Sequence, residues 1–507
     1  MCRITQECAP AVDRVVVVAV APAVPAARVG PRGQGGPGGP GEPGRGPGGG
    51  PFGPRAPQSV ESVKTSCAQL DKYGAIVKKF GMKRMKRMKN RNLTIGLALC
   101  LTATICLAED WPQWRGPRYD AVSRESGLPT EWGDSQNVAW KVQLPGIGSG
   151  TPVVWGNRIF LTSQAGNDLL LLGFNTDGKE QWRHRLGQGG SRGREEENNS
   201  ASSSPSTDGK LVFALVGSGD FAALDLNGKE VWRFNAQERY GNFSYDFGMH
   251  TTPLLYEGRL YLQLIHRSLQ VVVALDAATG KEVWQVDRPS DGRGECLNSY
   301  ASPSLWVRDG RARLITHGND YTIANSLTDG KEVWRLGDLN PKDRYDGSLR
   351  FVASPVAVAD LIVIPTAKNG AVVGVSPDAS GVLSAGSKGE LWRVARGTPD
   401  VPSPLVFEGR VFLCRETGVL ACLDAKTGKE YFSERFYPQT YRASPVIADG
   451  KLILIAKDGT FTVVKPGETL AILAKNMLSD QFAASPAISN GRLYLRGFAN
   501  LYAIGAK

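Results

Sequence analysis

A Ser/Thr-Pro dipeptide recurs along most of this 507-residue chain, and this repeat constrains the fold more than any other feature. Its spacing is 53, 48, 50, 52, 49, 41 and 41 residues. The eight prolines are Pro152, Pro205, Pro253, Pro303, Pro355, Pro404, Pro445 and Pro486. Internal repeats of this period indicate a solenoid, a propeller or an array of small units.

Each copy contains four strand-like runs. In the third copy they cover residues 253–256, 259–264, 269–275 and 282–285, with turns at Glu257-Gly258 and Thr279-Gly280. Short apolar runs between Gly, Asn and Asp turns predict antiparallel hairpins. Four such strands make one propeller blade, which must stack on its neighbours to bury both faces. The sequence therefore predicts an all-β, eight-bladed β-propeller of four-stranded antiparallel blades.

A large aromatic residue recurs in the fourth run of the copies. We interpret it as a wedge between blades, because a side chain of this size buries roughly 150–250 Å²; stacking on a ligand is the alternative. The predicted blade-docking residues are Trp140, Trp182, Trp232, Trp284, Trp334, Trp392 and Phe432.

The two ends of the repeat region complement each other. The eighth copy begins at Pro486 and ends three residues from the C-terminus, without room for a fourth strand. Residues 137–142 look like a fourth strand with no blade before it. We expect this N-terminal strand to complete the last blade, which would leave no open sheet edge in a propeller of residues 137–507.

The repeated turn sequence carries a family resemblance. Residues 274–284 read Ala-Leu-Asp-Ala-Ala-Thr-Gly-Lys-Glu-Val-Trp, and residues 223–232 give a close copy. This pattern resembles the repeat of the pyrroloquinoline-quinone (PQQ) propeller superfamily over residues 110–507. That superfamily includes quinoprotein dehydrogenases and the non-enzymatic outer-membrane assembly lipoprotein BamB. Residues 110–117, Asp-Trp-Pro-Gln-Trp-Arg-Gly-Pro, are similar to the lead-in of secreted PQQ-like bacterial proteins, so residues 109–136 are expected to be a lead-in segment.

The first 108 residues differ from the rest. Residues 1–81 include a Gly/Pro/Arg-rich stretch that cannot form a packed core, so we expect a disordered leader or a start codon assigned too far upstream. Residues 82–108 combine a basic run, a 15-residue apolar run and a final Ala, which is typical of a secretory signal peptide and too short for a membrane span. The mature protein is therefore expected in the periplasm or outside the cell, without a transmembrane span.

The net charge of +11 arises in this N-terminal region. Residues 1–108 hold 16 Lys and Arg against 5 Asp and Glu, and the remainder holds 44 of each. A neutral body gives no electrostatic support for nucleic-acid binding. We expect a protein or a polysaccharide of the cell envelope as partner, and a monomeric chain.

Few residues have the spacing of a catalytic or metal site. The four histidines show no zinc-ligand spacing, and no Gly-x-Ser-x-Gly nucleophile elbow occurs, so no catalytic or metal-binding residue is assigned. His250, His317 and Asp320 are candidates to face the central channel, although a structural role would suit each histidine. Cys296, Cys414 and Cys422 are expected to be buried as small apolar residues rather than paired.

Two functions are compatible with this sequence. The first is a secreted, non-catalytic platform that binds a protein or ligand and needs no cofactor. The alternative is a PQQ- and calcium-dependent dehydrogenase of alcohols or sugars, but the sequence lacks the adjacent cysteine pair found in several quinoproteins. Among the inserts, residues 376–389 look like a plain surface loop.

Overall fold

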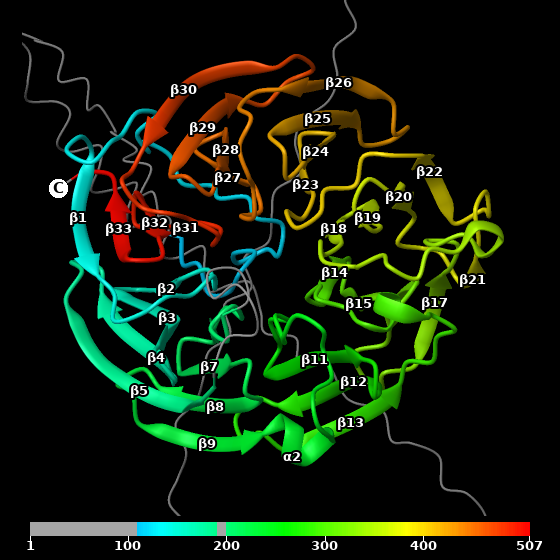
Figure 1. The fold of residues 1–507 in the computed structure, drawn as a ribbon, viewed down its shortest axis with the longest axis horizontal. Coiled ribbons are helices and arrows are strands. Elements are labelled where there is room, and N and C mark those ends of the chain that lie inside the picture. The colour runs from blue at the N-terminus through cyan, green and yellow to red at the C-terminus, as the bar shows by residue number, and fades with distance from the viewer. Residues whose placement is uncertain (1–108, 190–198, 507) are drawn as a thin grey trace, which may run out of the picture. The chain divides into compact units, whose positions relative to one another are not determined.

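The computed structural model describes residues 109–189 and 199–506, and within them the strands form eight sheets arranged in a ring (Figure 1). Each sheet is built from four consecutive antiparallel strands, apart from the shared last blade and one added strand. The predicted eight-bladed β-propeller is thus confirmed. The expected leader (1–81) and signal peptide (82–108) lie outside the described residues.

The blades follow one another in chain order. Blade 1 contains β2 (Val153–Trp155), β3 (Arg158–Ala165), β4 (Asp168–Asn175) and β5 (Glu180–Gln188). Blade 2 contains β6 (Ser206–Thr207), β7 (Leu211–Leu215), β8 (Asp220–Asp225) and β9 (Glu230–Asn235). Blade 3 contains β10 (Leu254–Tyr256), β11 (Arg259–His266), β12 (Leu269–Asp276) and β13 (Glu282–Asp287). Blade 4 contains β14 (Ser304–Arg308), β15 (Arg311–Gly318), β16 (Tyr321–Asn325) and β17 (Glu332–Leu336).

The second half repeats this plan. Blade 5 contains β18 (Val356–Val358), β19 (Leu361–Pro365), β20 (Val372–Val375) and β22 (Glu390–Val394). Blade 6 contains β23 (Leu405–Phe407), β24 (Arg410–Cys414), β25 (Val419–Asp424) and β26 (Glu430–Arg435). Blade 7 contains β27 (Val446–Ala448), β28 (Lys451–Ile455), β29 (Thr460–Lys465) and β30 (Ala471–Met477). Blade 8 contains β31 (Ala487–Ser489), β32 (Arg492–Arg496), β33 (Asn500–Ile504) and β1 (Val138–Gln143).

The N-terminal strand closes the ring, as expected. β1 pairs antiparallel with β33, with Lys141 opposite Tyr502 and Val142 opposite Leu501. The outer edge of the last blade is therefore supplied by residues more than 350 positions away in sequence, which ties the two ends of the propeller together.

Tight turns set the first hairpin of several blades. Glu257 and Gly258 both have positive φ, 45° and 72°, and connect β10 to β11. Two successive residues with positive φ match the twist of a two-residue hairpin, and Gly adopts this conformation without a Cβ penalty. The same positive-φ pair with Gly second occurs at 309–310, 408–409, 449–450 and 490–491.

The Asp-x-x-Thr-Gly turn connects the third strand to the outer strand. In blade 3 the Asp276 carboxylate accepts from the Thr279 backbone N–H at 3.0 Å and from the Thr279 hydroxyl at 2.7 Å. Gly280 follows with φ +66°, and a Cβ there would lie 2.8 Å from the ring of Trp232 on the preceding blade. The turn thus packs directly against the neighbouring blade.

The predicted docking tryptophans lie at this contact. Five of them donate a hydrogen bond from the indole nitrogen to a backbone carbonyl of the next blade. These bonds run from Trp140 to Thr176 (2.8 Å), Trp182 to Leu226 (3.1 Å), Trp232 to Ala277 (2.9 Å), Trp284 to Leu327 (3.1 Å) and Trp392 to Ala425 (2.9 Å). Phe432 is buried at the equivalent place in blade 6, with 8% exposure.

Trp334 in blade 4 differs from the others. It is buried, but its indole nitrogen has no hydrogen-bond partner among the described residues. Trp306 on β14, which the sequence pattern did not single out, donates instead to the Ala359 carbonyl of blade 5 at 3.1 Å. The expectation that residues 376–389 form a plain loop is wrong: β21 (Gly381–Leu383) pairs in parallel with β17 and gives blade 4 a fifth strand.

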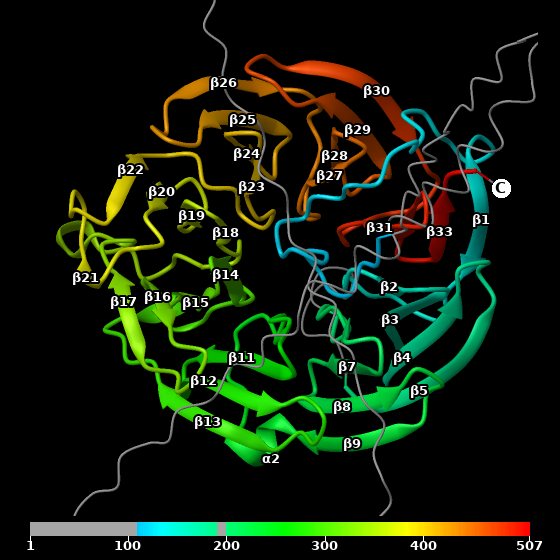
Figure 2. The ribbon, with the colours of Figure 1, turned by 180° about the vertical axis from the view of Figure 1, so that it is seen from behind.

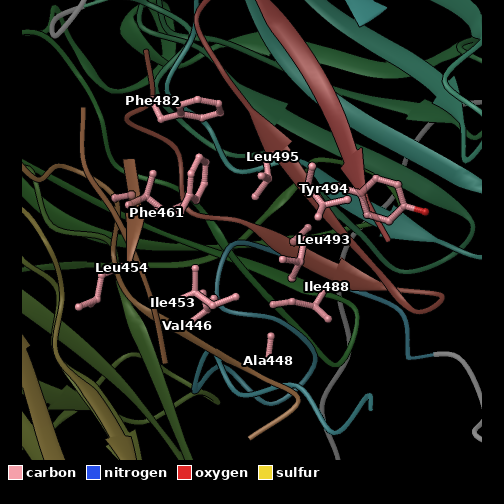
Figure 3. Packing of buried hydrophobic residues seen from close by; sticks show 14 of the residues in the cluster. Val446, Ala448, Ile453, Leu454, Phe461, Phe482, Ile488, Leu493, Tyr494 and Leu495 are labelled. Carbon is pink, nitrogen blue, oxygen red and sulfur yellow. The ribbon is translucent and has the colours of Figure 1, made fainter. Parts of the chain in front are cut away.

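Hydrophobic residues fill the space between neighbouring blades. Figure 3 shows this packing between blades 7 and 8, where the Phe461 and Phe482 rings lie 5.0 Å apart. The same cluster continues into the lead-in segment, because Trp132 packs edge-on against Phe461 at 5.6 Å.

The three cysteines of the propeller are buried and free, in agreement with the sequence analysis. In the β24–β25 hairpin, Cys414 lies opposite Leu420 and Cys422 opposite Phe412, so the two thiols are not cross-strand partners. In the part of the chain that the structure describes, no helix has the length and apolar character needed to cross a membrane.

Candidate functional site

A cavity of about 730 Å³ lies on the axis of the propeller, and every blade contributes to its wall. Most lining residues belong to the connections that precede the innermost strands, for example Asp246, Arg350 and Asp400. We call the side of the ring that carries these connections the connection face. The cavity is of the size typical of small-molecule sites, roughly 300–1,000 Å³.

The residue before each repeat proline lines this cavity. Within this set of eight residues, the first seven backbone N–H groups each donate to the hydroxyl oxygen of the equivalent residue in the next blade, at 2.9–3.0 Å. The eight residues are Thr151, Ser204, Thr252, Ser302, Ser354, Ser403, Ser444 and Ser485, and all are buried. We call this set the hydroxyl crown. It explains the recurrent dipeptide: proline holds the preceding residue extended, and the hydroxyl satisfies a buried N–H of its neighbour.

The lead-in segment (109–136) covers the cavity at the end opposite the connection face. Trp111 pairs with Val154 of blade 1, the Tyr119 hydroxyl donates to the Leu255 carbonyl of blade 3, and the Ser123 N–H donates to Ile447 of blade 7. Between these contacts, Trp114 lines the cavity. The segment, blue in Figure 2, crosses the centre of the ring. Because its Trp114 lines the cavity, the segment forms the floor of the cavity.

His250 is the one histidine that lines the cavity, as far as the described residues extend. Its Nε2 lies 2.8 Å from the Phe247 carbonyl oxygen, and since a carbonyl only accepts, Nε2 carries the proton. Burial lowers the pKa of His250, so the imidazole is neutral near pH 7 and Nδ1 is a hydrogen-bond acceptor. The Tyr300 ring lies beside it, with the ring centres 6.0 Å apart.

The two carboxylates that the described residues contribute to the cavity wall, Asp246 and Asp400, lie close to basic side chains. Arg267 donates to both oxygens of Asp246, at 2.8 and 2.6 Å, which lowers the pKa of Asp246. Lys368 lies 3.8 Å from an oxygen of Asp400, while its ammonium pairs more closely with Glu416, at 2.6 Å. Arg350 lies over the Phe247 ring, with its guanidinium carbon 4.9 Å from the ring centre. The basic side chains Arg442 and Lys457 also line the cavity.

These residues do not form a calcium site. Calcium takes six to eight oxygen ligands, usually with several carboxylates. Among the described residues, Asp246 and Asp400 are the carboxylates of the cavity lining; Arg267 binds Asp246, and the Lys368 ammonium lies 3.8 Å from Asp400. Across 109–189 and 199–506, no group of three His, Cys, Asp or Glu side chains is arranged to hold a metal ion. The donors of the cavity lining are therefore fewer than a calcium ion needs.

His317 and Asp320 are placed away from the cavity, in blade 4. His317 is fully buried; its Nδ1 lies 2.7 Å from the Thr322 hydroxyl, and burial lowers its pKa to about 3. Asp320 is 2% exposed and accepts a 2.7 Å hydrogen bond from the Tyr345 hydroxyl, with the Lys342 ammonium at 3.5 Å. Of the three candidates, only His250 lines the cavity. His317, at the end of β15, and Asp320, in the turn after it, are covered by the neighbouring connections.

Sequence reasoning missed the crown and the floor of the cavity. The Ser/Thr-Pro dipeptide was visible, but its hydroxyl was not recognised as a link between blades. The signal that could have revealed the crown was a Ser or Thr that recurs once in every repeat, directly before the proline. Trp114 and Arg115 gave no such signal, since only the path of the lead-in segment brings them to the axis.

An eight-bladed propeller with Asp-x-x-Thr-Gly turns and inter-blade tryptophans defines a PQQ-like β-propeller. The chain belongs to the family described as outer membrane protein assembly factor BamB, which it matches over residues 121–262, 227–385 and 380–470. The three overlapping matches reflect the repeated blades.

Curated relatives share part of the sequence. A putative dehydrogenase, XoxF of Paracoccus denitrificans, is 30% identical over 131 residues, which cover 24% of this chain and 20% of that protein. The quinohemoprotein alcohol dehydrogenase of Comamonas testosteroni is 26% identical over 182 residues, covering 34% of this chain and 22% of that protein. The matches thus span about a fifth of the length of these relatives.

Solved structures share the fold. BamB from Moraxella catarrhalis aligns with a TM-score of 0.51 and 14% identity, over 73% of this chain and 97% of BamB. A europium-containing methanol dehydrogenase aligns with a TM-score of 0.57 and 14% identity, over 77% of this chain and 90% of that one. The Comamonas testosteroni enzyme gives a TM-score of 0.56 with 14% identity, over 78% and 81% of the two chains. At these identities the likeness shows the fold alone.

Proposed function

We propose that this protein is an exported, non-catalytic PQQ-like propeller that binds a protein or polysaccharide of the cell envelope. The observation that carries this proposal is the axial cavity: it is large and lined by hydrogen-bond donors and aromatic rings, but its carboxylates are paired with cations and its hydroxyls link the blades. Such a wall can recognise a ligand without supplying a reactive group.

The arrangement of the side chains supports a non-catalytic role. An activated nucleophile needs a base within hydrogen-bond reach. Among the described residues, His250 bonds to a backbone carbonyl rather than to a crown hydroxyl. The thiols of the propeller are buried, and burial raises the pKa of Cys296 to about 11 and of Cys422 to about 12, which keeps both protonated.

The family and the N-terminal sequence support a place in the cell envelope. The family description refers to outer-membrane assembly, and residues 82–108 have the sequence pattern of a signal peptide. In this proposal the mature protein begins near Glu109, acts as a monomer and presents its connection face to the partner.

A PQQ-dependent dehydrogenase is the alternative. The sequence matches to two dehydrogenases and a cavity of about 730 Å³ favour it. The donors of the cavity wall argue against this alternative, because Arg267 binds the Asp246 carboxylate and the Lys368 ammonium lies near that of Asp400.

Blocking the cavity tests the proposal. Ala483 lines it, so Ala483→Trp fills space without removing a polar contact. Val382→Trp adds the same side chain at a position that is 79% exposed. A ligand that binds only the folded state at 100 times its dissociation constant stabilises it by about 2.7 kcal/mol. We expect oligosaccharides from the envelope to raise the melting temperature of the unsubstituted protein and of Val382→Trp, but not of Ala483→Trp. Equal stabilisation of all three would contradict binding in the cavity.

A further inference from the structure

The hydroxyl crown presents unused hydrogen-bond donors to the cavity. From Ser204 round to Ser485, each hydroxyl oxygen accepts an N–H from the preceding blade. Each hydroxyl also carries one proton. No bond in which a crown hydroxyl donates to another group occurs among the described residues. The oxygens are therefore fixed by the fold, while their protons are available to whatever occupies the cavity.

The floor beneath the crown carries a buried positive charge. Arg115 is only 8% exposed; its Nη2 donates to the Pro404 carbonyl at 2.8 Å, and its Nη1 has no partner in the described part of the chain. No carboxylate of the described residues lies within ion-pair distance of it. Burial lowers the pKa of Arg115 to about 10, so the guanidinium is still charged at neutral pH.

Arg115 lies next to the crown. A small space of about 20 Å³ is lined by Arg115 together with Trp114, Thr252 and Ser302, and the last three also line the axial cavity. A buried guanidinium with an unpaired donor is costly unless an acceptor approaches it. Arg115 therefore lies behind the crown residues Thr252 and Ser302, outside the lining of the axial cavity, and its guanidinium reaches Pro404 of blade 6. Its charge acts on the cavity from beneath the crown.

We infer that the axial cavity binds its ligand through an oxyanion, a carboxylate, sulfate or phosphate group held by the hydroxyl crown above Arg115. Such a group only accepts hydrogen bonds, and charge-assisted bonds to it are about twice as strong as neutral ones. This inference rests on the proposed function in one respect, that the cavity is the ligand site. It narrows the ligand from any envelope component to an acidic one, such as a uronic-acid or sulfated sugar.

The carboxylates of the cavity wall do not oppose this assignment. Asp246 and Asp400 belong to the connections on the connection face, not to the crown, and Arg267 and Lys368 lie beside them. A ligand can therefore enter with its acidic group leading and leave its uncharged part near Phe247 and Tyr300, which also line the cavity.

The test is isothermal titration of the purified full-length protein with D-glucuronate, D-glucose and inorganic phosphate. The two sugars differ in the carboxylate, and phosphate reports on a free oxyanion. We expect glucuronate to bind at least about tenfold more tightly than glucose, the equivalent of one charge-assisted bond. Binding of phosphate as well assigns the site to the free oxyanion, and binding of glucuronate alone assigns it to the acidic sugar. Equal affinities for the two sugars, or no saturable binding of glucuronate and phosphate, would overturn the inference.

Two matched pairs of variants locate the site. Arg115→Met should lower glucuronate affinity about tenfold, whereas Arg288→Met, which removes another buried guanidinium with an unpartnered Nη1 outside the cavity lining, should not. Thr252→Val removes a crown hydroxyl, and Thr207→Val removes a buried hydroxyl elsewhere that also accepts a backbone N–H. If both variants of a pair lost glucuronate affinity to the same extent, the assignment of the site to the crown would be overturned. PQQ-dependent turnover would refute the non-catalytic proposal without affecting these affinities, so the two failures can be told apart.

Discussion

The indole nitrogen of Trp140 donates a hydrogen bond of 2.8 Å to the carbonyl oxygen of Thr176. Trp140 belongs to β1 in the last blade, and Thr176 follows β4 in the first. This bond therefore joins the two ends of the ring with the same contact that joins the internal blades. The ring is closed by a standard inter-blade contact, even though the last blade is assembled from both ends of the propeller.

A glycine substitution tests this closing contact. Gly178 has φ +83°, and a Cβ there would lie 2.8 Å from the Trp140 ring, whereas Gly156, with φ +56°, has open space around its Cβ position. Both changes to Ala place a side chain on a left-handed backbone, which costs about 1 kcal/mol or more. We expect Gly178→Ala to lower the free energy of unfolding by at least about 1 kcal/mol more than Gly156→Ala. If urea denaturation showed equal decreases in the free energy of unfolding for the two variants, closure of the ring would not depend on this contact.

The crown links can be tested one at a time. Ser302→Ala leaves the Thr252 N–H, which donates to the Ser302 hydroxyl at 2.9 Å, without its partner in the protein. An unsatisfied buried donor costs about 1–3 kcal/mol. Ser384→Ala, at an exposed position, should change stability by no more than about 0.5 kcal/mol. Chemical denaturation measures the free energy of unfolding of both variants. If Ser302→Ala lost no more of this free energy than Ser384→Ala, a structural role for the crown would be contradicted.

The strand that the sequence did not reveal gives a third prediction. Leu383 and Val382 are neighbours on β21, but Leu383 is 5% exposed and packs in the cluster of Trp334, while Val382 is 79% exposed. Burying a carboxylate without a partner is unfavourable, so Leu383→Asp should destabilise the protein by about 3 kcal/mol or more. Val382→Asp should have an effect within about 0.5 kcal/mol. Similar melting temperatures for the two variants would mean that β21 does not cover the core of blade 4.

Buried histidines make the propeller sensitive to acid. Burial lowers the pKa of His317 from 6.5 to about 3 and that of His266 to about 4. The unfolded chain therefore binds these protons at higher pH than the folded chain, and stability falls as the pH drops from 6.5 toward 3. We expect His317→Gln to have a shallower loss of unfolding free energy between pH 6.5 and 4 than the unsubstituted protein. Identical slopes would show that His317 is not kept neutral by the fold.

Much of the fold was predictable from the sequence, because its determinants are local and repeated. The spacing of the Ser/Thr-Pro dipeptides predicted the number of blades, and the Asp-x-x-Thr-Gly turn marked where the outer strand of a blade begins. The run at 137–142 was recognisable as the missing strand because the last copy lacked one. β21 was not predictable, since its three residues become a strand only through pairing with β17, whose sequence lies more than 40 residues away.

The candidate site was less predictable than the fold. His250 was singled out because it directly precedes an inner strand, and it lines the cavity. His317 and Asp320 were singled out at a hairpin turn, and that turn lies between β15 and β16, outside the cavity lining. Arg115 reaches the axis only because the lead-in segment crosses the ring and bonds to Pro404, 289 residues away. Such a contact leaves no pattern in the local sequence.

The central claim is that the axial cavity binds a ligand without catalysing its oxidation. The most direct measurement is dye-linked oxidation of alcohols and sugars by the purified protein in the presence of PQQ and Ca²⁺, compared with Ala483→Trp. We expect no turnover above that of the heat-denatured protein in either case. Turnover that requires PQQ, disappears when calcium is chelated and is lost in Ala483→Trp would contradict the account and identify the cavity as a dehydrogenase active site.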